Sequence, residues 1–209
     1  MPDPTDRGRG EALLVHRAEP TVSCRSLAEL QAQSKDCTKC PLAATRTQVV
    51  FGRGDPSADL VFVGEAPGAE EDAQGFPFVG RSGKLLDQLV LEEIGLDRDS
   101  FFVMNTLMCR PPNNRDPLPD ELAACRPWFD LKLAALKPKV IVTLGNFASK
   151  ALLDSPLGIT KLRGQTYEWR DGIKLVPTFH PAAVLRGNTE AMAAMRADLV
   201  RAKKVLVPA

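Results

Sequence analysis

Residues 59–68 read DLVFVGEAPG, and this stretch decides how the chain folds. Four apolar residues in a row, Leu60 to Val63, are typical of a strand that is buried on both faces. The glycine, proline and acidic residues that follow predict a loop at the carboxyl end of that strand. Ligands of parallel sheets bind in the crevice beyond such strand ends, so the same stretch also marks a candidate site.

Two more short apolar runs, Phe101–Met104 and Val140–Leu144, repeat this strand pattern further along the chain. Asp171-Gly172 is a typical hairpin turn, and it predicts a strand pair formed by residues 165–169 and 174–178. Alternation of such strands with helical periodicity predicts an α/β protein, a three-layer α/β/α fold around a mainly parallel sheet. The predicted helices cover residues 26–35, 82–93, 119–137, 147–153 and 190–205.

The length and composition are those of one globular domain, with 209 residues, 44% of them hydrophobic and 25% charged. We expect residues 1–25 to be a flexible tail and residues 26–209 to form the domain. The net charge of +1 gives no general affinity for nucleic acid, although a local basic rim would suffice for DNA. No apolar run is long enough for a membrane span and no secretory signal is visible, which predicts a cytoplasmic location.

Four of the five cysteines form a pattern that suits a metal centre in a reducing compartment. Cys37 and Cys40 have C-x2-C spacing, and Cys109 and Cys125 follow far downstream. Four thiolates hold either a zinc ion or an iron–sulfur cluster, and the spacing alone leaves both open. The alternative is that these are ordinary core or surface thiols, which we also expect of Cys24.

The loop after the first strand combines acidic and aromatic residues. Glu65, Glu70, Glu71 and Asp72 could orient a water molecule or stabilise a developing cation, or they could form a solvated acidic loop. Phe78, between Gly75 and Gly80, could stack on a base or fill the core.

Polar residues also follow the other predicted strands. Asn105 ends the second strand, and its amide matches a pyrimidine edge that carries adjacent oxygen and N–H groups, unless it only forms a turn. His180 follows residues 174–178 and could donate to a carbonyl oxygen that gains charge, or could be structural. Leu185 and Arg186 could form an apolar wedge with a phosphate contact.

Taken in order, these motifs resemble the type 4, iron–sulfur uracil-DNA glycosylases. The resemblance covers residues 26–204 and implies a four-stranded parallel sheet between helices. It also implies that Cys37, Cys40, Cys109 and Cys125 hold a structural 4Fe-4S cluster. The resemblance rests on Cys37-x2-Cys40, Gly64–Gly68 with Glu71-Asp72, Gly75–Gly80, Asn105, Cys109–Arg115, Cys125 and His180-Pro181-Ala182.

The resemblance implies a DNA repair hydrolase that cuts the N-glycosidic bond of deoxyuridine in single- or double-stranded DNA. We expect it to act as a monomer, without a membrane partner. Uracil would be bound by Gly64, Glu65, Ala66, Phe78, Asn105 and His180, and the catalytic set would be Glu65, Glu71, His180 and Asn114. The expected DNA contacts are Arg81, Arg115, Leu185 and Arg186.

Three other functions remain open from the sequence. A related group with a histidine in place of Asn114 and a longer basic loop traps the abasic sugar covalently, whereas this chain has Asn113-Asn114-Arg115. A zinc-dependent structural or interaction protein would lack an active site. A phage-polymerase-related accessory protein would give Asn105 and Phe78 no role.

Overall fold

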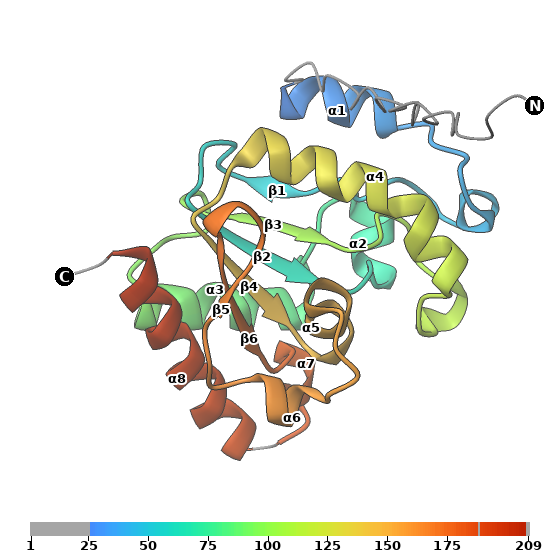
Figure 1. Cartoon of the computed structure of the whole chain (residues 1–209). Helices are drawn as coiled ribbons and strands as arrows, with labels where there is room; N and C mark the ends of the chain where they lie inside the picture. Colours follow the sequence, from blue (N-terminus) through green and yellow to red (C-terminus); the bar gives the residue numbers. More distant parts are fainter. Residues whose placement is uncertain (1–25, 188, 208–209) are drawn as a thin grey trace, which may run out of the picture.

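The computed structural model describes residues 26–187 and 189–207, which are built on one sheet of six strands (Figure 1). The strands lie in the order β1-β3-β2-β4-β6-β5. β3, β2, β4 and β6 are parallel, whereas β1 and β5 pair antiparallel with the two edges. Their bounds are β1 Arg53–Gly54, β2 Leu60–Gly64, β3 Phe102–Asn105, β4 Val140–Leu144, β5 Tyr167–Glu168 and β6 Lys174–Thr178.

The implied count of four strands is wrong, because two short strands extend the parallel core at its edges. β1 has two residues and no apolar run, so nothing in its composition marks it as a sheet strand, whereas β5 lies within the predicted hairpin. The predicted hairpin is confirmed: Tyr167 pairs with Leu175 and Glu168 with Lys174 across the turn at Arg170–Gly172.

Helices cover both faces of the sheet, as predicted. Alternate residues of β2 point to opposite faces, so Phe62 packs with α3 and α8, and Val61 packs with α4 and α5. Figure 1 shows α1 lying along α4 on the outer side of that second layer. The helices are α1 Leu27–Ser34, α2 Ala69–Gln74, α3 Arg81–Glu93, α4 Pro119–Leu136, α5 Asn146–Leu153, α6 Ile159–Leu162, α7 Pro181–Leu185 and α8 Thr189–Leu206.

The long predicted helices are confirmed, and the short ones were missed. α1 begins as expected with a reciprocal cap, in which Ser26 and Glu29 each accept from the backbone N–H of the other. α2, α6 and α7 lie in segments for which we predicted no helix, because six residues or fewer carry little periodicity.

The predicted tail, residues 1–25, lies outside the described residues, so the division of the chain at residue 25 stays a prediction. Within the described ranges, no helix is long and apolar enough to cross a membrane.

Candidate active site

The ends of β2, β3 and β6 meet at one edge of the sheet, and backbone hydrogen bonds lock the loops that follow them. Thr106 N–H donates to the Gly64 carbonyl (3.0 Å), and Leu107 N–H donates to the Glu65 carbonyl (3.0 Å). The Thr106 hydroxyl adds a bond to the same Glu65 carbonyl at 2.6 Å. On the other side, Gly145 N–H donates to the Thr178 carbonyl at 2.8 Å. The candidate site is therefore built on fixed backbone.

Gly64, Asn105 and Phe78 meet at the base of this site. A Cβ at position 64 would lie 2.4 Å from Asn105 Oδ1 and 2.8 Å from Phe78 Cζ, so only glycine fits between them. Phe78 has a φ of 55°, a left-handed conformation that costs free energy in a residue with a side chain. The start of α3 packs against this strained backbone, since a Cβ at Gly83 would lie 1.7 Å from the Phe78 carbonyl oxygen.

The Asn105 amide is open to a ligand. The side chain is 3% exposed, and no hydrogen bond joins it to another described residue. Among the described residues, the fully buried side-chain polar atoms that lack a hydrogen-bond partner belong to Asp87 and Arg98. The Asn105 amide also lacks a partner but is not fully buried, so a ligand can still reach it. An unpaired buried amide costs about 1–3 kcal/mol, which a ligand with complementary groups would recover.

His180 presents a neutral donor to the same site. It caps α7, where its Nδ1 accepts from the Ala182 N–H at 3.1 Å, so the ring proton is on Nε2. Burial, assisted by the positive charge of Arg186, lowers the pKa of His180 to about 4. Its ring lies against that of Phe78, with centroids 5.7 Å apart.

Glu71 and Glu65 occupy different environments. The Glu71 carboxylate accepts from three backbone N–H groups, those of Gly68 (3.2 Å), Val79 (3.0 Å) and Gly80 (3.2 Å). It thereby ties α2 to the segment that carries Phe78. The Glu65 carboxylate has no such bond within the described residues, and burial together with the charge of Asp116 raises its pKa.

The remaining site residues lie around the mouth. Arg81 and Arg186 are exposed, and Leu185 is an exposed apolar residue with 41% of its surface accessible. Arg115 instead forms a bidentate ion pair with the buried Glu121, at 2.6 and 2.9 Å. The exposed Asn114 side chain accepts from Arg110 Nε at 2.7 Å.

The four cysteines of the predicted centre are free thiols around one apolar cluster beneath α1 and α4. Cys40 and Cys125 each interact electrostatically with other members of the set, so the thiols are neighbours in space. In residues 26–187 and 189–207, however, no three Cys, His or acidic side chains converge as ligands of a single ion. The four thiols are therefore neighbours in space without forming a single-ion site in the described part of the chain.

Three donors surround these thiols. Arg46 Nη1 donates to Cys109 Sγ at 3.5 Å, and Trp128 Nε1 donates to Cys37 Sγ at 3.3 Å. Lys132 is fully buried nearby and donates to the Phe51 carbonyl at 2.8 Å. Burial raises the pKa of the Cys109 thiol to about 11 and also raises the pKa of Cys125.

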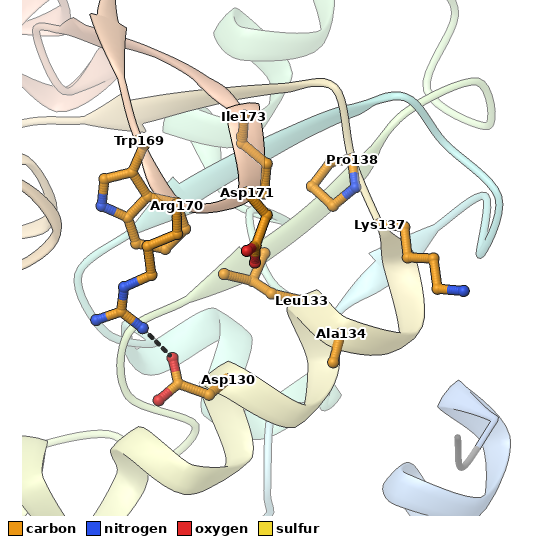
Figure 2. Close-up of a pocket in the computed structure, with 9 residues that line it drawn as sticks. All are labelled: Asp130, Leu133, Ala134, Lys137, Pro138, Trp169, Arg170, Asp171 and Ile173. Carbon is orange, nitrogen blue, oxygen red and sulfur yellow. Dashed lines mark hydrogen bonds and ion pairs between the residues drawn. The ribbon is translucent and has the colours of Figure 1, made fainter. Parts of the chain in front are cut away.

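A cavity in the described part of the chain lies away from this site. It measures about 450 Å³ and opens between the end of α4 and the β5–β6 hairpin (Figure 2). Figure 2 shows Leu133, Pro138 and Trp169 along its walls and the Arg170–Asp130 ion pair, 3.3 Å long, at its rim. Pro138 and Ile173 precede β4 and β6, so this cavity is at the amino ends of the strands, away from the candidate site.

Several contributors to these sites had no sequence signal. Asp116 influences Glu65 across two loops, and Gly145 approaches His180 so closely that a Cβ would lie 3.0 Å from the histidine Cβ. Arg46 and Lys132 look like ordinary surface charges in the sequence, because only the fold brings them to the cysteines.

Comparison with known proteins shows which family the chain resembles. The model of the family described as the uracil DNA glycosylase superfamily matches residues 51–202. A type-4 uracil-DNA glycosylase of Sulfurisphaera tokodaii is 47% identical, over 77% of this chain and 76% of the relative. One from Thermotoga maritima is 44% identical, over 82% of this chain and 90% of the relative. One from Archaeoglobus fulgidus is 43% identical, over 77% and 83%.

Proposed function

The chain belongs to the uracil-DNA glycosylase superfamily, and we propose that it removes uracil from DNA as a type-4 enzyme of that group. It hydrolyses the N-glycosidic bond between uracil and deoxyribose and leaves an abasic site for repair. The observation that carries this proposal is the nearly buried Asn105 amide, which has no hydrogen-bond partner among the described residues and lies beside Gly64 and the Phe78 ring. A flipped pyrimidine needs these features: a stacking ring, an edge reader and a floor without side chains.

Asn105 selects uracil by its hydrogen-bonding edge. Its amide presents a donor and an acceptor side by side, which match O4 and N3–H of uracil. Cytosine has an amino group in place of O4 and lacks the N3 proton, so both bonds would be lost in the amide orientation that pairs with uracil. Burying those unpaired groups would cost about 1–3 kcal/mol each. Phe78 stacks on the base, and the backbone of Gly64 to Ala66 encloses it.

His180 stabilises the leaving group. As the glycosidic bond breaks, its electron pair moves onto the uracil ring and charge accumulates on O2. His180 donates to O2 through Nε2–H, because Nδ1 is held as an acceptor by the Ala182 N–H. With a pKa lowered to about 4, the imidazole remains a neutral donor at physiological pH.

Glu65 orients the attacking water. The sugar that remains is an oxocarbenium-like cation, and water adds to C1′ while Glu65 accepts its proton. We assign this role to Glu65 because its carboxylate is free of backbone donors, unlike that of Glu71. Glu71 holds the Phe78 segment and adds negative charge near the cation. Asn114 supports the sugar side of the site.

The rim of the pocket would grip the DNA. Arg81 and Arg186 are free to contact phosphates, and the exposed Leu185 would enter the stack where the uridine leaves it. Arg115 contributes less directly, because Glu121 already holds its guanidinium. We propose action on both single- and double-stranded DNA, by a monomer, in the cytoplasm.

Cys37, Cys40, Cys109 and Cys125 would hold a 4Fe-4S cluster. The fit is supported by the donors around them: Arg46 and Lys132 form no ion pair with a carboxylate in the described part of the chain, so thiolates would supply their missing counter-charge. The cluster would tie α4 to the loops after α1 and β3, and it takes part in no step above. Iron and sulfide analysis with absorbance near 400 nm tests it; a colourless, zinc-loaded protein would contradict it.

The covalent trap finds no support in the comparisons, since the similar relatives are described as glycosylases. One assay tests the proposal against it. Purified protein is incubated with a labelled oligonucleotide that holds one uracil, beside a thymine control, and treated with alkali. We expect cleavage only at uracil, with many turnovers per enzyme. A denaturant-resistant adduct without turnover would indicate trapping, and no reaction from iron-loaded protein would refute the glycosylase function.

A further inference from the structure

Lys132 is a buried cation without an anionic partner. It lies on α4 and is 1% exposed, and its ammonium donates to the Phe51 carbonyl at 2.8 Å. The Phe51 ring adds a cation–π contact, with the ammonium 5.1 Å from the ring centroid. No carboxylate within the described residues pairs with it. Buried lysines are rare unless paired, so this environment is incomplete without a negative charge.

The thiolates of the proposed cluster would supply the negative charge that Lys132 lacks. Cys125 precedes Lys132 by two helical turns, so both side chains lie on the same face of α4. The Phe51 carbonyl that accepts from the Lys132 ammonium belongs to a residue of the same buried cluster as Cys109 and Cys125. A 4Fe-4S core bound by four thiolates is anionic as a whole, and one more electron makes it more so.

Arg46 repeats this arrangement on a second thiol. Its Nη1 lies 3.5 Å from Cys109 Sγ, and it too forms no ion pair among the described residues. Arg46 is half-buried, so water screens its charge more than that of Lys132. Trp128 completes the set with a neutral N–H donor 3.3 Å from Cys37 Sγ.

We propose that the positive charges of Lys132 and Arg46 balance the negative charge of the cluster and together set its reduction potential. This inference rests on the proposed cluster. A cation beside the thiolates stabilises the reduced, more negative cluster and thus raises the potential. The effect of Lys132 is the larger, because it acts through a less screened interior. Neither residue touches the base or the sugar, so their removal changes the cluster and leaves the chemistry at the uracil pocket intact.

A redox titration of the full-length, iron-loaded protein, followed by absorbance and electron paramagnetic resonance, tests this assignment. We expect Lys132→Met and Arg46→Gln to shift the potential to more negative values, with the larger shift in Lys132→Met. Arg46→Lys keeps the positive charge, so its reduction potential should lie close to that of the wild type. The matched control is Lys139→Met, which removes an exposed lysine paired with Asp59 and should leave the potential unchanged.

The outcomes separate this inference from the cofactor proposal on which it rests. Wild-type protein without iron and sulfide would refute the cluster itself. Variants with full iron content and an unchanged potential would refute the counter-charge role alone. If Lys132→Met cannot retain a cluster, Arg46→Gln decides: a negative shift supports the role, and no shift overturns it.

Discussion

The Asn105 amide is nearly buried, unpaired and turned toward the pocket, a costly arrangement for the free protein. A binding site can retain this free-energy cost, because the amide forms its hydrogen bonds only when the ligand is bound. His180 and Glu65 also depart from ordinary behaviour: burial lowers the pKa of the histidine and raises that of the carboxylate. Each of the three leads to a prediction.

Asn105→Ala should separate stability from activity. Removing an unpaired buried amide should leave the free energy of unfolding unchanged or raise it, while the rate on uracil falls by on the order of 100-fold or more. Urea denaturation and kcat/KM on a uracil oligonucleotide measure the two effects. Gln88→Ala, on the outer side of α3, is the control and should change neither. A variant as destabilised as it is inactive would contradict this view of Asn105.

His180 should make the free energy of unfolding depend on pH in acid. Its pKa falls from 6.5 to about 4 on folding, so the folded state binds fewer protons than the unfolded state between these values. Stability from this group is therefore complete above pH 6.5 and is lost as the pH falls toward 4. Denaturant titrations at several pH values measure the difference in the free energy of unfolding between wild type and His180→Gln. His16 is present in both proteins and therefore does not contribute to this difference. A difference that is constant across this range would argue against the assigned tautomer and burial.

Asp116→Asn should move the acid limb of the activity profile. Burial and the charge of Asp116 both raise the pKa of Glu65 above 4.5, and a protonated Glu65 accepts no proton from water. Without Asp116 the pKa of Glu65 falls, so kcat should persist to lower pH. The measurement is a pH profile of kcat for both proteins. An unmoved limb would mean that another group is the base.

Short elements carry the site, and α2 is the clearest example. Its six residues place Glu71 where one carboxylate can hold three N–H groups, two of them directly after Phe78. The left-handed backbone of Phe78 costs free energy, and these bonds help to offset it. The stacking ring thus depends on a helix that contacts no base.

Glu71→Ala should therefore damage binding and stability together. We expect a loss of about 1–3 kcal/mol in the free energy of unfolding, because charge-assisted bonds to the backbone are removed. KM should rise more than kcat falls, since Phe78 loses its position, whereas Glu65→Gln should lower kcat with little change in stability. Steady-state kinetics and thermal unfolding of both variants distinguish the roles. Equal effects on kcat in two equally stable variants would make Glu71 a catalytic residue instead.

The molecule as a whole depends on links between layers near the site. Asp198 of α8 is 1% exposed and binds the Thr178 hydroxyl at 2.8 Å and Arg163 through two bonds of 2.9 and 3.0 Å. Gly164 N–H adds a further bond at 3.2 Å. This network joins α8, the segment after α6 and the end of β6, two residues before His180.

Asp198→Ala should destabilise the fold by about 3–5 kcal/mol, the usual cost of removing one partner from a buried ion pair. Urea denaturation measures it. Asp154→Asn, at the exposed end of α5, serves as a control that should stay close to wild type, because asparagine also tolerates the left-handed backbone of this position. A small effect of Asp198→Ala would mean that water readily replaces the carboxylate.

Local patterns predicted much of this protein. The apolar run before Gly64 predicted a buried central strand, and periodicity located α3, α4, α5 and α8, because both signals are contained in a few neighbouring residues. Motifs in order also pointed to the family that the comparisons show. The two-residue strand β1 and the helices of six residues or fewer were not predicted, because contacts with distant segments stabilise them rather than their own composition.

The chain's sequence by itself determined the layered fold, the strand ends where the site lies and the residue types that the chemistry needs. Only the tertiary structure decided which carboxylate is free, because Glu65 and Glu71 differ in the backbone N–H groups that surround them and not in kind. It likewise decided that Lys132 pairs with no carboxylate among the described residues, and that Gly64 leaves room for Asn105 and Phe78. Partners, burial and pKa depend on residues far apart in the chain, and packing alone brings these together.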